Sequence, residues 1–375
     1  MPQIDRKFLF MLGALVLFGL VMLTSASGPV AYHKFDDAYW YVWHQLLNGL
    51  LPGAVLFFIL SHVDYRYLRK FSRHFFFVSI ALLLLVFIPG IGAEWGTSRS
   101  WINLGGFSLQ PAEVVKLTLL MFLADWLAGR TTDELNDPKI GLWPFLLTLG
   151  SISLLVILQP DLGSLSVIVA LSIIVFFLSG APLAHLAGLS ASGAAAFYLL
   201  IKSAPYRAER LMTFLHPELD PQGIGYHINQ SFLAIGSGGL FGLGLSHSRQ
   251  KYMYLPEVVG DSIFAIIAEE LGFVLTFAVL VLMAAFILRL IAIARQAPDR
   301  FSALFTAGVA GWLVSQILLN IGSMIGLLPM TGLPLPLISH GGTALFIMLA
   351  TMGIVANISR HVAVANQSRN GRRLV

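Results

Sequence analysis

Residues 254–272 read YLPEVVGDSIFAIIAEELG and place three acidic side chains where a long apolar helix begins. The apolar run after Asp261 is long enough to span a bilayer, and Glu269 and Glu270 lie two turns into it. An ionised side chain is costly at membrane depth, so it usually pairs with another group or faces a polar cavity. The stretch therefore predicts a spanning helix with a polar site at its start.

Composition places the whole chain in a membrane. The 375 residues are 57% hydrophobic and 11% charged, with a mean hydropathy of +0.80, whereas a soluble domain carries about 25% charged residues. The apolar runs are continuous and do not alternate with polar residues, which favours helices over a β-barrel. The chain has no cysteine, which excludes disulfides and cysteine-ligated metals. We therefore expect an all-α polytopic membrane protein.

Ten apolar runs have the length that a bilayer requires. We expect them to form one membrane domain over residues 1–375, with a long extracytoplasmic loop, about residues 202–260, between spans seven and eight. The first run resembles a signal peptide, but similar runs recur along the chain, so we expect it to be retained. The expected spans lie near residues 8–25, 43–60, 74–91, 112–129, 142–158, 162–179, 182–201, 262–292, 303–326 and 337–358.

Basic residues orient these spans. The net charge of +4 hides an uneven distribution, because most of the 23 Lys and Arg fall in loops on one side or in the tail. By the positive-inside rule this side is the cytoplasm, and both termini lie there. The basic balance therefore reflects topology and does not indicate a nucleic-acid partner. The residues assigned to the cytoplasm are Arg6, Lys7, Arg66, Arg69, Lys70, Arg73, Arg130, Lys139, Arg289, Arg295, Arg300, Arg360, Arg369, Arg372 and Arg373.

Most of the unexpected polar side chains fall in the outer loops. They come from several separate connections, and this convergence predicts one polar cavity that opens to the outer face. A long loop in a compact chain is usually functional, and Gly, Tyr and Phe throughout residues 202–260 indicate that this loop is ordered. The polar residues are Arg99, Gln110, Glu113, Asp161, Arg207, Arg210, Asp220, Gln230, Glu257, Asp261, Asn320 and His340.

Several of these residues have a structural interpretation beside the functional one. Glu113 and Lys116 lie three residues apart at a helix start, and a simple helical ion pair is the favoured interpretation. Asp161 follows a proline before a span, so it could cap that helix or contact a ligand. Arg207 and Arg210 could lie on a solvated face or bind a diphosphate, whose oxygens match the paired donors of Arg.

Asp261 could also be a helix N-cap, but its surroundings favour a functional role. A second acid, Glu257, lies about one turn earlier, and two basic residues are close by in sequence. For Glu257, Glu269 and Glu270 we expect structural pairing, because each acid is costly in lipid without a partner.

Two further segments indicate shaped backbone. No strand precedes the Gly-rich stretch 234–244, so it is not a nucleotide-binding loop, and its glycines let the chain pack close to the membrane surface. Residues 326–342 contain Pro329, Pro334 and Pro336, whose rigid turns predict a re-entrant or lining segment.

A series of short motifs resembles the SEDS family of bacterial shape, elongation, division and sporulation proteins, which includes RodA, FtsW and SpoVE. Each motif is weak alone, but their order and spacing over nearly the whole chain are specific. The motifs are Arg99-Ser-Trp-Ile-Asn-Leu-Gly105, Gln110-Pro-Ala-Glu-Val-Val-Lys116, Gln159-Pro-Asp-Leu-Gly163, Tyr206-Arg207 with Arg210, Asp220-Pro221, Gly225-Tyr226, Gln230-Ser231, Gly236-Ser-Gly-Gly239, Leu255-Pro-Glu257, Asp261 with Ile263-Phe264-Ala265, Glu269-Glu-Leu-Gly272, Pro334-Leu-Pro-Leu-Ile-Ser339 and Gly341-Gly342.

The resemblance implies a peptidoglycan glycosyltransferase that polymerises lipid II at the outer face of the bacterial cytoplasmic membrane and releases undecaprenyl diphosphate. The family's essential acid falls on Asp261, which would act as a general base or would hold a divalent cation, Mg²⁺ or Mn²⁺. The residues expected to line the cavity and bind substrate are Arg207, Arg210, Lys116, Glu113, Arg99, Gln110, Asp161, Gln230 and Ser339.

The resemblance also implies a partner and a cellular role. The family works with a class B penicillin-binding protein, a transpeptidase, in the division or elongation machinery, and residues 249–254 look nearer FtsW than RodA. Two positions depart from the family pattern. The polar or His-containing stretch before the acid is Val258-Val259-Gly260 here, which leaves no polar side chain between Glu257 and Asp261, and the final Ser-Tyr-Gly-Gly pattern reads Ser339-His340-Gly341-Gly342.

Two other classes of function fit a polytopic chain. A lipid II flippase would use intramembrane acids as relays, but its path must reach both faces, whereas the polar residues here gather on one face. Transporters often contain inverted repeats, and none is visible in the sequence. A non-catalytic scaffold for a transpeptidase would tolerate loss of Asp261.

Overall fold

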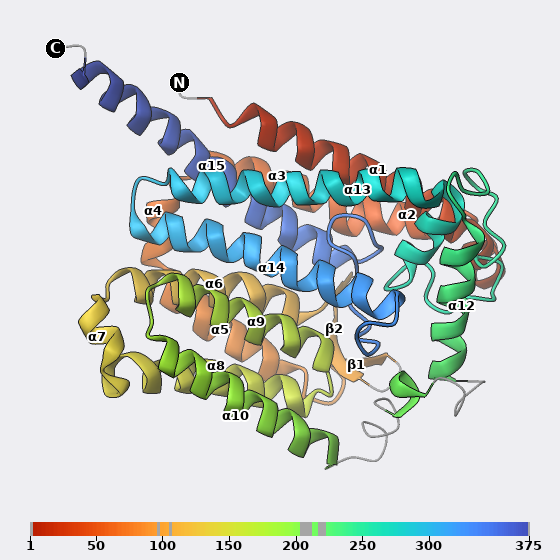
Figure 1. Cartoon of the computed structure of the whole chain (residues 1–375), viewed down its shortest axis with the longest axis horizontal. Helices are drawn as coiled ribbons and strands as arrows, with labels where there is room; N and C mark the ends of the chain where they lie inside the picture. Colours follow the sequence, from red (N-terminus) through yellow and green to blue (C-terminus); the bar gives the residue numbers. More distant parts are fainter. Residues whose placement is uncertain (1–2, 96–97, 105–106, 203–211, 217–222, 374–375) are drawn as a thin grey trace.

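Apolar helices that run roughly parallel make up most of the molecule (Figure 1). The computed structural model describes residues 3–95, 98–104, 107–202, 212–216 and 223–373. The two chain termini lie at one end of the helical bundle, and the strands and α12 lie at the other (Figure 1). The basic loops assigned to the cytoplasm share the end with the termini, so we call the opposite end the outer end.

The helices and strands follow the predicted order of spans. The helical elements are α1 (Arg6–Phe35), α2 (Trp40–Gln45), η1 (Leu46–Leu50), α3 (Leu51–His62), α4 (Tyr65–Lys70), α5 (Ser72–Leu85), α6 (Pro111–Ala128), α7 (Thr132–Asn136), η2 (Pro138–Leu142), α8 (Trp143–Leu158), α9 (Leu162–Leu178), α10 (Leu183–Lys202), α12 (Ile224–Ser237), α13 (Ile263–Arg295), α14 (Arg300–Met324) and α15 (Gly342–Arg373). The strands are β1 (Gly92–Trp95), β2 (Ser98–Leu104) and β3 (Phe107–Leu109).

The prediction of an all-α polytopic fold is confirmed. Every predicted span coincides with a helix, and among the described residues six helical stretches are long and apolar enough to cross a membrane by length and composition. The last predicted span begins too early, because α15 starts at Gly342 and not near residue 337. Pro334 and Pro336 disfavour helix in the preceding segment, and Leu337 there has a φ of 66°.

A small antiparallel sheet at the outer end was not predicted. Strand β2 pairs with β1 and β3, with Ile102 opposite Gly92 on one side and Leu109 on the other. The sheet is tied to the bundle because Thr343 Oγ1, in α15, donates to Ser108 O over 2.9 Å. The strands are short and lie between two spans, so they carry little of the periodic signal that longer strands provide.

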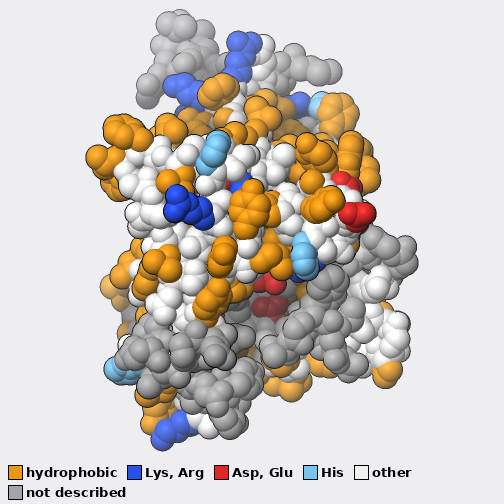
Figure 2. Space-filling model, turned by 90° about the vertical axis from the view of Figure 1, so that its right-hand side faces the viewer, with side chains coloured by type: hydrophobic (Ala, Val, Ile, Leu, Met, Phe, Trp, Pro, Cys, Tyr) orange, Lys and Arg blue, Asp and Glu red, His pale blue; other side chains and the backbone are white. Residues whose placement is uncertain are grey.

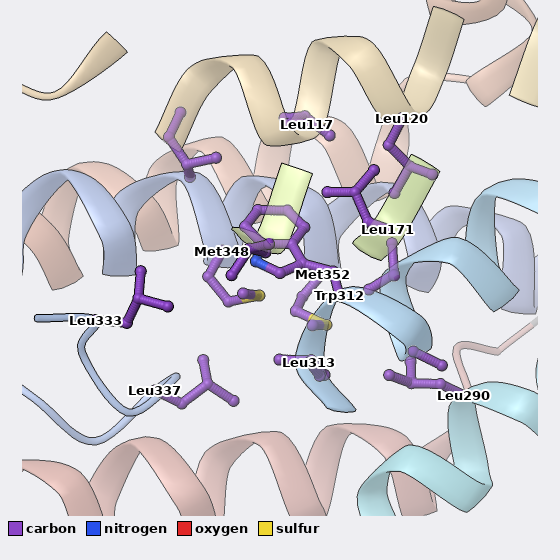
Figure 3. Close-up of a cluster of buried hydrophobic side chains, with 14 of the residues drawn as sticks. Leu117, Leu120, Leu171, Leu290, Trp312, Leu313, Leu333, Leu337, Met348 and Met352 are labelled. Atoms are coloured by element: carbon purple, nitrogen blue, oxygen red, sulfur yellow. The ribbon is translucent and has the colours of Figure 1, made fainter. Parts of the chain in front are cut away.

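The core of the bundle lies where α6, α9, α14 and α15 meet. Trp312 of α14 is fully buried and lies at the centre of a cluster that includes Leu120, Leu171 and Met352 (Figure 3). The indole Nε1–H donates to Gln316 Oε1 over 2.8 Å, so its polar atom is satisfied inside the core. This packing makes α14 a central support for the segments at its outer end.

Helix α13 is broken near its outer end. Gly272 has φ 70° and ψ −179° inside the helix, so residues 263–271 form a separate short helix before the long one. The backbone of residues 239–244 inserts at this break, where Leu243 N donates to Glu269 O and Gly244 N donates to Glu270 O, each over 3.0 Å. A Cβ at residue 272 would overlap the backbone of Phe241 and Gly242, so any residue other than glycine requires this backbone to shift.

The break at Gly272 explains how Glu269 and Glu270 can belong to an apolar helix. At 1.5 Å per residue, residues 273–295 alone extend about 35 Å, which is enough to cross a bilayer core of about 30 Å. The short helix with Glu269 and Glu270 therefore lies outside the length that the membrane requires. Gly238 and Gly242 pack against this short helix, because a Cβ at either position would overlap its backbone, and residues 234–237 belong to α12.

Candidate functional site

Asp261 lies at the outer end of the bundle, just before α13. The N-cap of α13 is Ser262, so Asp261 precedes the cap position and does not cap the helix. Its backbone is held from α14, because Asn320 Nδ2 donates to Asp261 O and to Leu333 O, each over 2.7 Å. The side chain of Asp261 is partly exposed. The acid is thus fixed at its backbone, and the residue is not fully enclosed by its neighbours.

The charge state of Asp261 is unusual for an aspartate. Burial and, after it, the nearby carboxylate of Glu257 together raise its pKa to about 7, while the hydrogen bond from Ser262 acts in the opposite direction. Ser262 Oγ donates to Asp261 Oδ1 over 3.3 Å. A group whose pKa lies near the operating pH can both accept and release a proton, which suits general acid–base catalysis.

Glu257 contributes through its backbone and its charge. Its side chain is exposed, and its carbonyl accepts from Gly260 N over 3.0 Å and from Ser262 N over 3.2 Å. Among the described residues no ion pair involves this carboxylate, so the expected structural pairing of Glu257 is not seen there. The turn that it closes instead places the two acids within electrostatic interaction of each other.

Segments from distant parts of the sequence converge around Asp261. The backbone N–H of His340, after the proline-rich segment, donates to Val259 O over 2.8 Å. The centroid of the His340 ring lies 5.0 Å from that of the Tyr41 ring in α2. His227 of α12 lies on another side, 2.6 Å from Ser262 Oγ. Burial lowers the pKa of both histidines to about 4, so both rings are neutral at pH 7. Figure 2 faces the outer end and shows acidic side chains in a recess near its middle.

Glu269 and Glu270 have a different environment from Asp261. Both are 1% exposed. Glu270 Oε1 accepts from Lys251 Nζ over 2.8 Å and Oε2 accepts from Ser25 Oγ over 2.6 Å. Glu269 accepts from the backbone N–H of Arg249 over 2.9 Å and from the Ser248 hydroxyl. The structure therefore gives both acids partners and ties the loop to α1 and α13.

Glu113 and Lys116 form a pair inside the bundle. Lys116 Nζ lies 2.6 Å from Glu113 Oε1 and 3.2 Å from Gln316 Oε1, and both charged side chains are 2% exposed or less. Glu113 and Ser339 line a narrow cavity of about 10 Å³, and Ser339 Oγ accepts from Leu335 N over 2.8 Å. Lys116 and Ser339 thus stabilise the core and the proline-rich segment, and neither faces solvent.

Gln110 and Asp161 are brought together near the outer ends of α6 and α9. Gln110 Nε2 donates to Asp161 Oδ2 over 3.1 Å, while Asp161 Oδ1 caps α9 by accepting from Ser164 N over 2.9 Å. The capping interpretation of Asp161 therefore holds. Gln230 is partly exposed on α12, and Arg99 lies in strand β2.

The cationic part of the predicted site falls outside the described residues. Arg207, Arg210 and Asp220 lie in the segments 203–211 and 217–222, which are not among the described residues. Within the described residues no group of three or more His, Asp or Glu side chains is arranged to hold a metal ion.

Two residues beside Asp261 were missed from the sequence. Ser262 adjoins the acid, but a serine before an apolar run is an ordinary helix N-cap and does not by itself indicate a functional site. His227 is separated from Ser262 by 35 positions, and only the packing of α12 on α13 brings the two together.

Comparisons with known proteins agree over almost the whole chain. The profile of the FtsW, RodA and SpoVE family, described as cell cycle proteins, matches residues 5–364. Stage V sporulation protein E of Bacillus subtilis is 41% identical over 92% of this chain and 94% of its own. A probable peptidoglycan glycosyltransferase FtsW of Trichlorobacter lovleyi is 37% identical over 97% of this chain and 95% of its own.

Solved structures show the same fold. A chain from a structure of a peptidoglycan synthase complex that coordinates polymerisation and crosslinking superposes with a TM-score of 0.79, at 30% identity over 96% of this chain and 98% of its own. The rod shape determining protein RodA of Thermus thermophilus superposes with a TM-score of 0.69, at 30% identity over 95% of this chain and 97% of its own.

Proposed function

Since the chain belongs to the FtsW, RodA and SpoVE family of cell cycle proteins, we propose that it is a peptidoglycan glycosyltransferase that polymerises lipid II. Its sequence relatives are named for that activity, and its helices make it a multi-pass protein of the cytoplasmic membrane. The single observation that carries the chemistry is Asp261, a partly exposed acid at the outer end with a pKa raised to about 7.

Asp261 would act as the general base. The 4-hydroxyl of the acceptor sugar attacks the anomeric carbon of the donor, and the bond between that carbon and the diphosphate oxygen breaks. The hydroxyl proton passes to the Asp261 carboxylate, and undecaprenyl diphosphate leaves. A carboxylate with a pKa near 7 is about half ionised at neutral pH, and its ionised form has enough affinity for the proton to assist the attack.

The leaving diphosphate requires positive charge. Arg207 and Arg210 are the candidates for this role, because the guanidinium group binds phosphate oxygens with paired donors. Lys116 is a poor candidate, since its ammonium is fully buried and bound to Glu113. The two prenyl tails would lie in apolar grooves between the spans.

A divalent cation is the alternative source of that charge. Asp261 and Glu257 present two carboxylates so close that the charge of one raises the pKa of the other, and a cation between them would relieve this repulsion. Mg²⁺ is commonly held by one or two carboxylates together with substrate phosphate oxygens, so the donor set fits Mg²⁺ or Mn²⁺. When bound, the ion would neutralise charge on the diphosphate.

A transpeptidase is the expected partner. The solved structure of a peptidoglycan synthase complex couples polymerisation to crosslinking, and its superposed chain shares 30% identity with this one. We infer that this chain also works beside a class B penicillin-binding protein. Its relatives named FtsW and SpoVE favour a role in division or sporulation over elongation.

The activity can be tested directly with purified protein and lipid II. Glycan polymer is expected from the wild-type chain, while Asp261→Ala and Asp261→Asn should form none and keep the wild-type unfolding temperature. A chelator arm, with Mg²⁺ or Mn²⁺ added back, separates a cation ligand from a base. Full activity in both Asp261 variants would point to another acid, and wild-type protein that moves lipid II across vesicles without polymerising it would support a flippase.

A further inference from the structure

We propose that His227 and Ser262 position the Asp261 carboxylate through a hydrogen-bond chain that crosses from α12 to the start of α13. His227 Nε2 lies 2.6 Å from Ser262 Oγ, and Ser262 Oγ lies 3.3 Å from Asp261 Oδ1. The inference rests on the proposed function, because it concerns the group that would accept the proton of the acceptor sugar. Neither residue would touch the substrate, so both act through Asp261.

The direction of the chain follows from the hydrogens available. An ionised carboxylate can only accept, so Ser262 uses its one hydroxyl hydrogen toward Asp261 Oδ1. Ser262 Oγ then accepts from its other partner, which requires a hydrogen on His227 Nε2. The buried imidazole is neutral at pH 7, because burial lowers the His227 pKa to about 4, and it therefore has one N–H to donate. The geometry assigns that hydrogen to Nε2.

Packing holds His227 in place for this role. Ser231 Oγ, one turn further along α12, donates to His227 O over 2.9 Å and lies 3.6 Å from the sulfur of Met324 in α14. At the end of α12, Gly238 lies so close to α13 that a Cβ would overlap the carbonyl of Ala268. The helix that carries the imidazole is thus fixed against both α13 and α14.

The chain has a chemical consequence for the acid. With Oδ1 engaged by Ser262, the other carboxylate oxygen is the one left to take the proton, and the side chain is kept from rotating away. Residues 258–260 are Val-Val-Gly and supply no polar side chain to do this. The support comes instead from the residue after Asp261 and from a separate helix.

A double-mutant cycle in the lipid II polymerisation assay tests the proposal. His227→Phe keeps an aromatic ring and removes the N–H. We expect kcat to fall about 10- to 100-fold with KM within about twofold, which is part of the roughly 10²–10⁴-fold that a positioned base contributes. Ser262→Ala should lower kcat comparably, and the double variant should be no slower than the slower single variant, because both break one chain. His227→Gln retains an N–H donor and should stay within about threefold of wild type.

The controls separate this inference from loss of folding and from the proposed function. His247→Phe alters an exposed histidine of the same loop and should leave kcat unchanged. Wild-type kcat in His227→Phe, losses that multiply in the double variant, or equal losses in His227→Gln and His227→Phe would each overturn the proposal. Should His227→Phe not fold, kcat of Ser262→Ala is compared with kcat of Ser262→Thr, which keeps the hydroxyl. The proposal then requires a loss in Ser262→Ala that Ser262→Thr largely avoids, and equal losses would overturn it. Inactive wild-type protein would overturn the proposed function, and the inference with it.

Discussion

The segment at the outer end of α13 holds two kinds of acid within ten residues, 261–270. Glu269 and Glu270 are 1% exposed, and each accepts hydrogen bonds from more than one partner. Asp261 is partly exposed, its carboxylate accepts a long hydrogen bond from the Ser262 hydroxyl, and its charged neighbour is another acid. Carboxylates of one segment therefore have two uses. Those of Glu269 and Glu270 hold the loop, whereas that of Asp261 is left available for a reaction.

The difference lies in what each acid would do if it lost its charge. Neutral Glu270 would leave the Lys251 ammonium buried without a counter-ion, which is strongly destabilising. Neutral Asp261 would relieve its repulsion with Glu257, so the folded protein tolerates it. The folded structure does not require Asp261 to stay ionised. Its carboxylate can therefore gain and lose a proton during a reaction, which distinguishes it from Glu270.

The largest effect is expected from Asp261→Asn. Activity in the polymerisation assay should fall at least about 10³-fold, since a positioned base contributes about 10²–10⁴-fold and the amide cannot accept the proton. The thermal unfolding temperature in detergent should stay the same or rise slightly. A large fall in that temperature would place Asp261 with the structural acids and remove the contrast.

Glu270→Ala should mainly affect stability. Removing one partner of a buried pair costs about 3–5 kcal/mol, so we expect a clear drop in the unfolding temperature. Replacing both members, as in Lys251→Met with Glu270→Leu, should recover most of the loss, because no charge is then left buried. If Glu270→Ala unfolds like wild type yet is inactive, the acid has a chemical role.

Gly272→Ala should have a smaller effect at the same junction. The positive φ of 70° costs about 1–3 kcal/mol for a residue with a Cβ, and the methyl group would push against residues 241–242. We expect a moderately lower unfolding temperature and faster proteolysis in the loop before Asp261. The nearby Gly236→Ala, where a Cβ meets nothing within 4 Å, is the matched control.

The smallest effect is expected from Ser25→Ala. The hydroxyl donates to Glu270 Oε2 over 2.6 Å, and a hydrogen bond to a charged group contributes about 1.5–3 kcal/mol, of which the remaining partner Lys251 should preserve a part. The expected change is a few degrees in unfolding temperature with near-normal activity per folded molecule. An activity loss as large as that of Asp261→Asn would mean that the contacts of Glu270 with Ser25 and Lys251 shape the reaction site itself.

The sequence by itself determined the class of fold and most of the helices. Continuous apolar runs such as that of α9 (Leu162–Leu178) are local features, because each span must satisfy its own backbone in lipid. The proline-rich segment before α15, the cap at Asp161 and the pair of Glu113 with Lys116 were also accessible, since each depends on residues close in sequence. Neighbouring charges favoured a functional role for Asp261, and the order of the motifs identified it with the family's essential acid.

The tertiary structure alone decided which acid is free and what surrounds it. The break at Gly272 arises because a loop inserts there, and the partners of Glu270 come from α1 and from Lys251 of the loop. His227 reaches Ser262 across 35 positions only because α12 packs on α13. Contacts between segments distant in the chain follow from shape and packing, which leave no periodic pattern in the sequence.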